Sequence, residues 1–200
     1  MRRERCWDIA AVILAAGEGK RFGENKALAN HEGQSFLGLI GDNLRRAGCG
    51  PIIAVLGSQA AAVAREADRI GIAYAINSAW KDGQFSSLKT GLAAFTREVC
   101  GAVIALVDHP FVRFETYVKL KEAFAKNPRR IIIPLHDRKR GHPVVIPYKI
   151  MREVMESPDE TNLKVIIGKH ERMVNLVRSD DPGVVTDIDT REDLDRISGR

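Results

Sequence analysis

The sequence is poor in cysteine, and its cysteines form neither a disulfide framework nor a metal-binding pattern. Only Cys6, Cys49 and Cys100 occur among 200 residues. Their number is odd, no CxxC pair is present, and two of them adjoin a glycine. This usage is typical of reduced structural thiols, so we expect no chemistry from them.

Long apolar runs are also missing. No segment of about 18 apolar residues occurs, although a membrane-spanning helix needs such a length. Residues 1–8 are charged and lack the apolar stretch of a signal peptide. We therefore expect a cytoplasmic protein with no membrane partner.

Basic runs and aromatic stacking motifs are absent as well. The net charge is +5 and the pI is about 9.2, yet acidic residues are interspersed almost everywhere. Nucleic-acid-binding domains gather their cations in stripes or patches. A phosphorylated small molecule accounts for the excess of cations equally well, so we expect no nucleic-acid partner.

Nothing in the sequence divides the chain. It contains no internal repeat, no low-complexity segment and no long linker rich in proline, glycine or serine. A chain of this length buries roughly 70% of the surface that its unfolded form exposes, which is enough for one stable core. We therefore expect a single domain, 1–200.

Short apolar runs alternate with helical patterns along most of the chain. The run from Ile9 to Leu14 is apolar throughout, as in a strand buried on both faces of a parallel sheet. Ser35 is placed to cap a helix that carries Phe36, Ile40 and Leu44 at helical spacing. The predicted strands are 9–14, 51–56, 73–76, 102–107, 131–135, 144–146, 173–177 and 184–188. The other predicted helices are 59–70, 87–96, 113–127, two short ones within 149–170, and a final one from Thr190. This order predicts an α/β fold, a three-layer α/β/α sandwich around a mostly parallel, Rossmann-like sheet.

The segment after the first predicted strand is the leading candidate for a ligand site. Open α/β sheets bind ligands beyond the carboxyl ends of their strands. The segment reads LAAGEGKRFG from Leu14 to Gly23 and continues to Lys26. Its small residues let backbone amides approach a ligand, and Lys20, Arg21 and Lys26 supply positive charge. This combination suits a triphosphate.

Three other interpretations of this segment compete with a triphosphate loop. A GxGxxG dinucleotide fingerprint loses support because Phe22 stands where the third glycine belongs. A Walker A loop cannot be aligned on Gly17 and Gly19. The remaining alternative is an ordinary glycine-rich turn with a solvated charged face.

Carboxylates follow two later apolar runs. Asp108 follows the run 103–107, at a strand end where a hard cation bridging phosphate oxygens would sit. Its alternative role is that of a turn residue before Pro110. Asp187 and Asp189 lie two apart on a predicted strand, so both side chains would face the same way. Alternatively, Asp189 only supports the capped start of the final helix.

Polar residues in two other segments are weaker candidates. Ser87 opens a predicted helix whose N-terminus attracts anions, although its role can be that of a cap alone. His142 is placed to orient a substrate, but a histidine at a loop–strand junction is more often simply packed. The basic segment 138–140 is a candidate for a second substrate's phosphate, and a solvated loop is the alternative.

The segment from Leu14 to Lys26 resembles the LAAGxGxRFGxxK signature of the MobA-like nucleotidyltransferases at every fixed position. Later family motifs follow in order. They are Gly83 to Leu92 around Ser86-Ser87-Leu88, Val107 to Pro110, Gly141-His142-Pro143, and Asp187 to Thr190. The resemblance therefore spans nearly the whole chain. It implies a nucleotide-diphospho-sugar transferase type of fold, with a nucleotide-binding half at about 8–110 and an acceptor-binding half at about 111–200.

The resemblance implies a Mg²⁺-dependent enzyme that transfers a nucleoside monophosphate to a phosphorylated acceptor and releases pyrophosphate. Such chemistry needs positioning and charge neutralisation instead of a protein nucleophile. The implied substrates are CTP and molybdopterin, with a transient contact to a molybdoenzyme or its chaperone. Guanylyl transfer to molybdopterin and nucleotidyl transfer to a sugar phosphate are the alternatives. A nucleotide-binding regulator without turnover is the alternative from another class.

The family's site residues can be carried onto matching positions of this sequence. The catalytic residues are then Arg21, Lys26 and Asp108. The nucleotide-binding residues are Leu14, Ala15, Ala16, Gly17, Gly19, Lys20, Arg21, Lys26, Ser86 and Ser87. The acceptor-binding residues are His142 and Arg140, and the metal ligands are Asp108 and Asp189, with Asp187 as second choice. One segment departs from the family, because Glu160 to Ile166 replaces a GDxGAR-like motif on the acceptor side.

Overall fold

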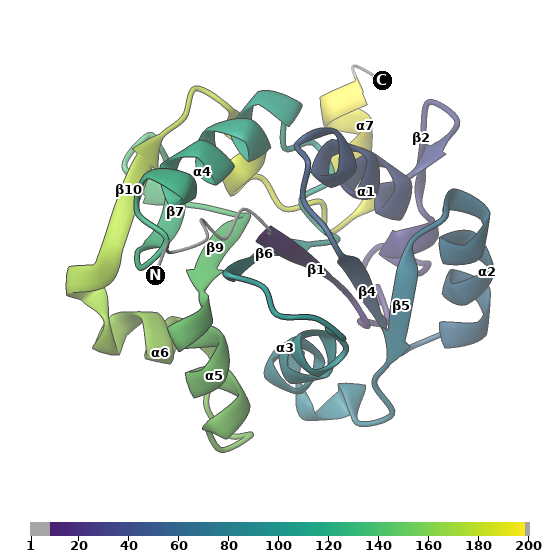
Figure 1. Cartoon of the computed structure of the whole chain (residues 1–200). Coiled ribbons are helices and arrows are strands. Elements are labelled where there is room, and N and C mark those ends of the chain that lie inside the picture. The colour runs from purple at the N-terminus through teal and green to yellow at the C-terminus, as the bar shows by residue number, and fades with distance from the viewer. Residues whose placement is uncertain (1–8, 199–200) are drawn as a thin grey trace.

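The computed structural model describes residues 9–198, and a single mixed sheet forms its centre (Figure 1). Along the sheet the strands are ordered β5 (Ala73–Ile76), β4 (Ile52–Leu56), β1 (Ile9–Ala15), β6 (Gly101–Leu106), β9 (Val144–Pro147), β7 (Ile131–His136) and β10 (Val174–Arg178). The short β8 (Lys139–Arg140) pairs with β7. Strand β9 is antiparallel to both of its neighbours, and the other main pairs are parallel.

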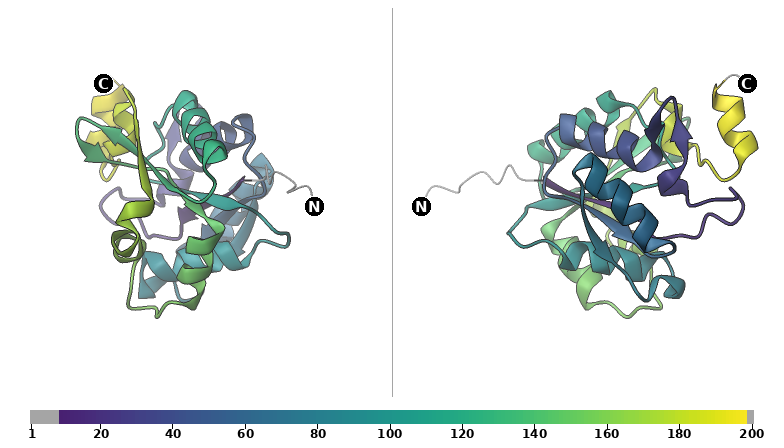
Figure 2. Two further views of the ribbon diagram at one scale, coloured as in Figure 1. Left: turned by 60° about the vertical axis from the view of Figure 1, so that its left-hand side comes forward. Right: turned by 90° about the vertical axis from the view of Figure 1, so that its right-hand side faces the viewer.

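Helices cover both faces of this sheet (Figure 2). On one face lie α1 (Phe36–Arg46), α2 (Ala60–Ile70) and α4 (Phe114–Lys126). On the other lie α3 (Gln84–Ala93), α5 (Tyr148–Glu156) and α6 (Leu163–Lys169). Helix α7 (Arg191–Ser198) closes the described chain, and β2 (Asn30–His31) with β3 (Gln34–Ser35) forms a small hairpin. The predicted three-layer α/β/α sandwich is confirmed.

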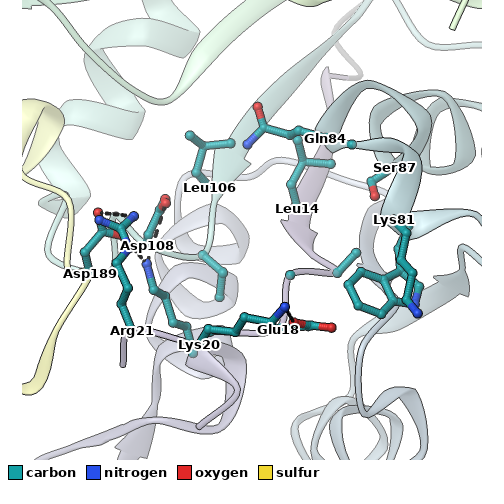
Figure 3. A pocket seen from close by; sticks show the side chains of 17 residues that line it. Leu14, Glu18, Lys20, Arg21, Lys81, Gln84, Ser87, Leu106, Asp108 and Asp189 are labelled. Atoms are coloured by element: carbon teal, nitrogen blue, oxygen red, sulfur yellow. Dashed lines mark hydrogen bonds and ion pairs between the residues drawn. The ribbon is translucent and has the colours of Figure 1, made fainter. Parts of the chain in front are cut away.

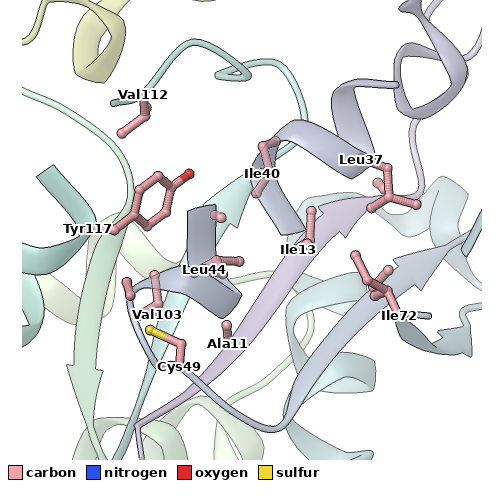
Figure 4. Packing of buried hydrophobic residues seen from close by; sticks show 14 of the residues in the cluster. Ala11, Ile13, Leu37, Ile40, Leu44, Cys49, Ile72, Val103, Val112 and Tyr117 are labelled. Atoms are coloured by element: carbon pink, nitrogen blue, oxygen red, sulfur yellow. The ribbon is translucent and has the colours of Figure 1, made fainter. Parts of the chain in front are cut away.

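The two apolar faces of β1 explain these layers. Every residue of β1 is buried, and alternate side chains enter opposite cores. Figure 4 shows Ile13 of β1 near Ile40 and Leu44 of α1, as the helical spacing of the apolar residues in α1 predicts. On the opposite face α3 lies so close to β1 that a Cβ on Gly91 would stand 2.5 Å from a methyl group of Val12.

Most predicted strands and helices are confirmed to within a few residues, and two are corrected. Helix α3 begins at Gln84, three residues before the predicted start at Ser87, because Gly83 is its N-cap. The predicted strand 184–188 is wrong. Its first part belongs to a 3-10 helix, Pro182–Val185, which the Asp181 carboxylate caps by accepting a hydrogen bond from Gly183 N. The residues that follow form an irregular segment.

The cysteine prediction is only partly confirmed. Cys49 is a buried free thiol, and burial raises its pKa to about 11. Cys100 is disulfide-bonded, so the expectation of a reduced thiol is wrong for that residue. The charged segment 1–8, with Cys6, lies outside the described residues. None of the described helices is long and apolar enough to cross a membrane.

Candidate nucleotide-binding site

Two neighbouring cavities open where the strand order reverses between β1 and β6. Chain connections run from β1 outward to β4 and later return to β6 on its other side, so the ends of these two strands diverge into a crevice. The first cavity measures about 730 Å³. It is lined by the predicted residues Leu14, Ala16, Gly17, Gly19, Lys20, Arg21, Lys26, Ser87, Asp108 and Asp189, and also by Glu18, Trp80, Lys81, Gly83, Gln84, Leu106 and Val107.

The loop after β1 owes its shape to Gly19. This residue has φ +66°, and a Cβ on it would lie 2.0 Å from the carbonyl oxygen of Glu24. The Gly19 carbonyl accepts hydrogen bonds from Phe22 N and Gly23 N at 2.9 and 3.0 Å. A side chain at this position would therefore strain the backbone and open the loop.

Phe22 anchors the same loop to the protein core. Its ring is 1% exposed and lies against Phe36 of α1, with centroids 6.0 Å apart. The guanidinium of Arg191 in α7 covers the ring at 4.7 Å. The phenylalanine that argued against a dinucleotide fingerprint therefore holds the cation-bearing loop in place.

Asn25 positions Lys26, a role that the sequence analysis missed. The buried Asn25 side chain accepts a hydrogen bond from Ala27 N and so caps the 3-10 helix Lys26–Leu28. Its amide also donates to the carbonyl of Ser58, at 2.9 Å. An asparagine immediately before a predicted loop cation is a capping signal, but its partner 33 residues away is visible only in the fold.

Two of the three loop cations, Arg21 and Lys26, converge on one carboxylate, Asp189, whereas the exposed Lys20 pairs with Glu18 (Figure 3). Lys26 Nζ lies 2.5 Å from Asp189 Oδ1 and 4.0 Å from Asp108 Oδ2, and Arg21 Nη2 lies 2.8 Å from Asp189 Oδ2. The hydrogen bond from Lys26 lowers the pKa of Asp189. The Lys26 side chain is 13% exposed, whereas that of Arg21 is 74% exposed. The structure thus joins residues 163 positions apart into one charged cluster.

Asp108 lies just beyond the end of β6 with an unsatisfied oxygen. Its Oδ1 is buried and has no hydrogen-bond partner among the described residues. Burial raises the pKa of Asp108, and the nearby His109 and Lys26 act in the opposite direction. A buried, unpaired carboxylate oxygen facing a charged cavity fits a hard divalent cation, which prefers oxygen ligands.

Asp187 takes a different direction from Asp189, contrary to the prediction that both lie on one face of a strand. Its side chain is 60% exposed, and its Oδ1 lies 2.8 Å from His109 Nε2. The other ring nitrogen of His109 faces the carbonyl of Gly183 at 3.2 Å. No strand covers this segment, so the alternation that the prediction assumed does not apply.

The opposite end of the cavity carries Lys81, Gln84 and the buried Ser87 (Figure 3). The amide of Asn77 donates to both Ser86 Oγ and Ser87 Oγ, at 2.9 and 3.0 Å. Ser86 holds the turn together by donating to backbone carbonyls and does not line the cavity. Asn77 was missed in the sequence, because nothing in the short apolar run before it marks it as a support for two serines.

Arg140 and His142 lie in the second cavity, which measures about 950 Å³. The Arg140 guanidinium forms two hydrogen bonds to the carboxylate of Glu171, one of them at 3.1 Å. Within the described chain His142 Nδ1 has no hydrogen-bond partner, and burial lowers the His142 pKa to about 4. The segment that departs from the family signature lines this cavity through Glu160 to Lys164. The cavities share Leu14, Gly83, Gln84 and Leu106.

Comparison with known protein families shows to which family this chain belongs. Residues 11–174 match the MobA-like NTP transferase domain. The chain belongs to this family. The match covers β1 from Ala11 onward, the loop after it, and the residues that line both cavities except Asp189. The expected family relationship and nucleotide-diphospho-sugar transferase fold are therefore confirmed.

Proteins similar to this chain are named for different activities. The nicotine blue oxidoreductase of Paenarthrobacter nicotinovorans is 29% identical, covering 94% of this chain and 96% of its own. The molybdenum cofactor cytidylyltransferase of Escherichia coli K12 is 25% identical, covering 93% of both chains. The crystal structure of Rv0371c from Mycobacterium tuberculosis superposes with a TM-score of 0.81 at 25% identity, covering 96% of this chain and 98% of that one. Rv0371c has also been solved as a complex with manganese.

Proposed function

We propose that this protein transfers the nucleoside monophosphate of an NTP, preferably CTP, to a phosphorylated acceptor, with molybdopterin as the acceptor and Mg²⁺ as the metal. The observation that carries the proposal is the buried oxygen of Asp108, which has no hydrogen-bond partner among the described residues and lies in the same cavity as Lys26 and Arg21, at the sheet's switch point. A nucleotide-binding module without turnover has no need for a carboxylate held in this way.

Arg21 and Lys26 would bind the triphosphate. Arg21 and Lys26 are neutralised by Asp189 in this structure, so an arriving triphosphate competes with that carboxylate for them. Their transfer to phosphate oxygens leaves Asp189 free to join Asp108 as a metal ligand. When bound, Mg²⁺ supplies positive charge that stabilises the transition state and the departing pyrophosphate. The chain's own residues provide position and charge, and no side chain needs to act as a nucleophile.

The acceptor would approach from the second cavity. An oxygen of its phosphate attacks the α-phosphorus, the bond between the α-phosphorus and the bridging oxygen breaks, and pyrophosphate leaves with that oxygen. The passage between the cavities is bordered by Leu14, Leu106 and Gln84. This arrangement supports a nucleotide-binding half at about 8–110 and an acceptor-binding half at about 111–200.

The choice of CTP rests on the first cavity's far end. Ser87 is fixed by Asn77 and lines this end of the cavity together with Lys81 and Gln84, and the short turn that carries Ser86 and Ser87 suits a pyrimidine. Thermal unfolding with CTP, GTP, ATP and UTP, each with and without Mg²⁺, tests this choice, because a ligand that binds the native state raises its stability. CTP with Mg²⁺ should give the largest shift and should support pyrophosphate release with molybdopterin. A larger shift and faster turnover with GTP would reverse the assignment.

A second candidate function is the reduction of an organic ring compound. It is favoured by the 29% identity to nicotine blue oxidoreductase over nearly the whole of both chains. In that case a reduced nicotinamide nucleotide would occupy the first cavity and pass a hydride to a compound in the second. This second function is disfavoured because Phe22 stands where the third glycine of a GxGxxG dinucleotide fingerprint belongs. Oxidation of NADH or NADPH by a dye acceptor, with no nucleotidyl transfer from CTP, would favour this function over the first.

A further inference from the structure

The second cavity differs from the first in its walls. Side chains from the sheet form one wall and side chains from helices α3 and α6 form the other, and both walls are apolar. The sheet contributes Leu106, Ile133 and Val144, and the helices contribute Phe85, Leu163 and Ile167. An apolar slot of about 950 Å³ is large enough for a fused ring system with substituents.

Charge is distributed in opposite ways in the two cavities. Lys20, Arg21, Lys26 and Lys81 line the first, against three carboxylates, Glu18, Asp108 and Asp189. Asp82, Asp159, Glu160 and Glu171 line the second, against two cations, Arg140 and Lys164. The first cavity is therefore better suited to phosphates, and the second has an excess of negative charge among its lining residues.

The one arginine of the second cavity is already engaged. Arg140 holds Glu171 through two parallel hydrogen bonds, a geometry that also fits a substrate carboxylate or phosphate. An anionic group entering here would have to displace Glu171 or stand close to it. The predicted role of Arg140 as a phosphate-binding residue is therefore not supported by its contacts.

His142 offers a neutral hydrogen-bonding group instead. Its Nδ1 is buried and free of partners among the described residues, and its low pKa keeps the ring uncharged at neutral pH. A neutral imidazole pairs with a neutral donor or acceptor on a ligand without the cost of burying a charge.

We infer that the second cavity takes an uncharged fused ring system, and that Glu171, by occupying Arg140, discriminates against rings that carry a negative charge. The inference rests on the proposed function, which places the acceptor's phosphate in the first cavity and its ring in the second. It extends that function by naming the chemical class of the ring and the residue that selects it.

Two fluorescent pterins of the same size provide a matched test. Binding of 6-hydroxymethylpterin, which is uncharged, and of pterin-6-carboxylate, which is anionic, is measured by fluorescence titration of the full chain. The uncharged pterin should bind at least about tenfold more tightly, because like charges placed close together oppose binding. In Glu171→Gln the freed Arg140 should tighten binding of the carboxylate at least about threefold, with little change for the uncharged pterin.

Glu122→Gln is the control, because it removes the same charge from an exposed position of α4 outside both cavities. It should leave the ratio of the two affinities unchanged. Three results would overturn the inference: no binding of the uncharged pterin, equal or tighter binding of the carboxylate by the wild-type protein, or the same response in both variants. Stabilisation by CTP is measured in parallel. If it persists while the pterin result fails, the proposed nucleotidyl transfer stands and only the inference about the ring is lost.

Discussion

Replacing Asp108 with asparagine separates the proposed role of this residue in metal binding from any role in folding. Its Oδ1 is buried without a hydrogen-bond partner among the described residues, with His109 Nε2 at 4.0 Å, and burial raises the pKa of the carboxyl, so the charge is poorly compensated in the free protein. Lys26 Nζ is 4.0 Å away and is held more closely by Asp189. The amide keeps the shape and removes the buried charge. We therefore expect Asp108→Asn to fold normally, with a free energy of unfolding equal to or slightly above that of the wild type.

Activity should respond very differently to the same substitution. A bound metal stabilises the charge of a transition state by several kcal/mol, and each ~1.4 kcal/mol corresponds to a factor of ten in rate. Losing about 4 kcal/mol of this stabilisation lowers turnover at least about a thousandfold. The assay is pyrophosphate release at saturating Mg²⁺, with circular dichroism as the check on folding. Asp189→Asn should lose less, because a neutral oxygen can still serve Mg²⁺ while Asp108 anchors the ion.

Asp187→Asn is the matched control for this experiment. It changes a carboxylate in the same segment as Asp189, but its side chain contacts His109 and is 60% exposed. We expect turnover to fall by less than about tenfold, which is a loss below ~1.4 kcal/mol. If Asp108→Asn retains more than a tenth of wild-type turnover, Asp108 is a turn residue and the metal assignment is wrong. If Asp187→Asn is as damaging as Asp108→Asn, the choice of Asp189 over Asp187 as the second ligand is wrong.

Three further predictions concern the phosphate loop and His142. Arg21→Ala should weaken nucleotide binding at least about tenfold without changing stability. Lys26→Ala should weaken binding and also lower the free energy of unfolding by about 1–3 kcal/mol, because the Lys26 side chain is 13% exposed and ion-paired. Unchanged nucleotide affinity in both variants would contradict the phosphate-loop assignment. Gly19→Ala should lower both nucleotide affinity and melting temperature, since φ +66° and a backbone oxygen 2.0 Å from the added Cβ force the loop to move; a crystal structure with an unmoved loop would contradict this. Burial lowers the pKa of His142 from 6.5 to about 4. Between these two pH values the unfolded state binds more protons at His142 than the folded state does, so the free energy of unfolding decreases as the pH falls below 6.5. Wild-type unfolding free energy should therefore drop about 2 kcal/mol more than that of His142→Gln between pH 7 and pH 5 in urea titrations, and parallel pH profiles would refute the burial argument.

The strands and most helices were predictable because their signals are local. The run Ile9–Ala15 is apolar on both faces, and the Ser35 side chain caps α1 by accepting a hydrogen bond from Gly38 N at 3.1 Å. The segment 184–188 was misassigned for a reason that is equally physical. An apolar stretch that includes Val184 and Ile188 resembles a strand, and both side chains are buried. Val184, however, lies in the 3-10 helix that Asp181 caps, and Ile188 lies in the irregular segment after it, where Ile188 N donates a hydrogen bond to Asp108 O.

The loop and the carboxylates of the candidate site were predictable, but their pairing was not. Spacing along the sequence places Lys26 after β1 and Asp108 after β6, so both were expected at the same edge of the sheet. The ion pair between Lys26 and Asp189 joins residues 163 positions apart. No local sequence pattern distinguishes a carboxylate that binds a metal from one that forms an ion pair with a lysine in the absence of substrate. The metal-ligand role of Asp189 therefore stays a prediction that depends on Lys26 leaving it.

The ligand of the second cavity, where we propose that the acceptor binds, is harder to predict from the sequence and the family than that of the first cavity. The arrangement of the fold explains this difference. The nucleotide loop is bound to the core through Phe22 and Gly19, so changes there disturb the fold itself. Part of the second cavity is lined by the connection between α5 and α6, by Arg140 of β8 and by Glu171 of η3. The side chains of Arg140 and Glu171 are exposed. Loops on a constant scaffold can change without loss of the fold, and function follows the site they form. Relatives named as a cytidylyltransferase and as an oxidoreductase match this chain over 93% and 94% of its length, as expected if the scaffold is shared and the second cavity differs. The pair of Arg140 with Glu171 is therefore a better guide to the acceptor of this protein than its overall identity to any one relative.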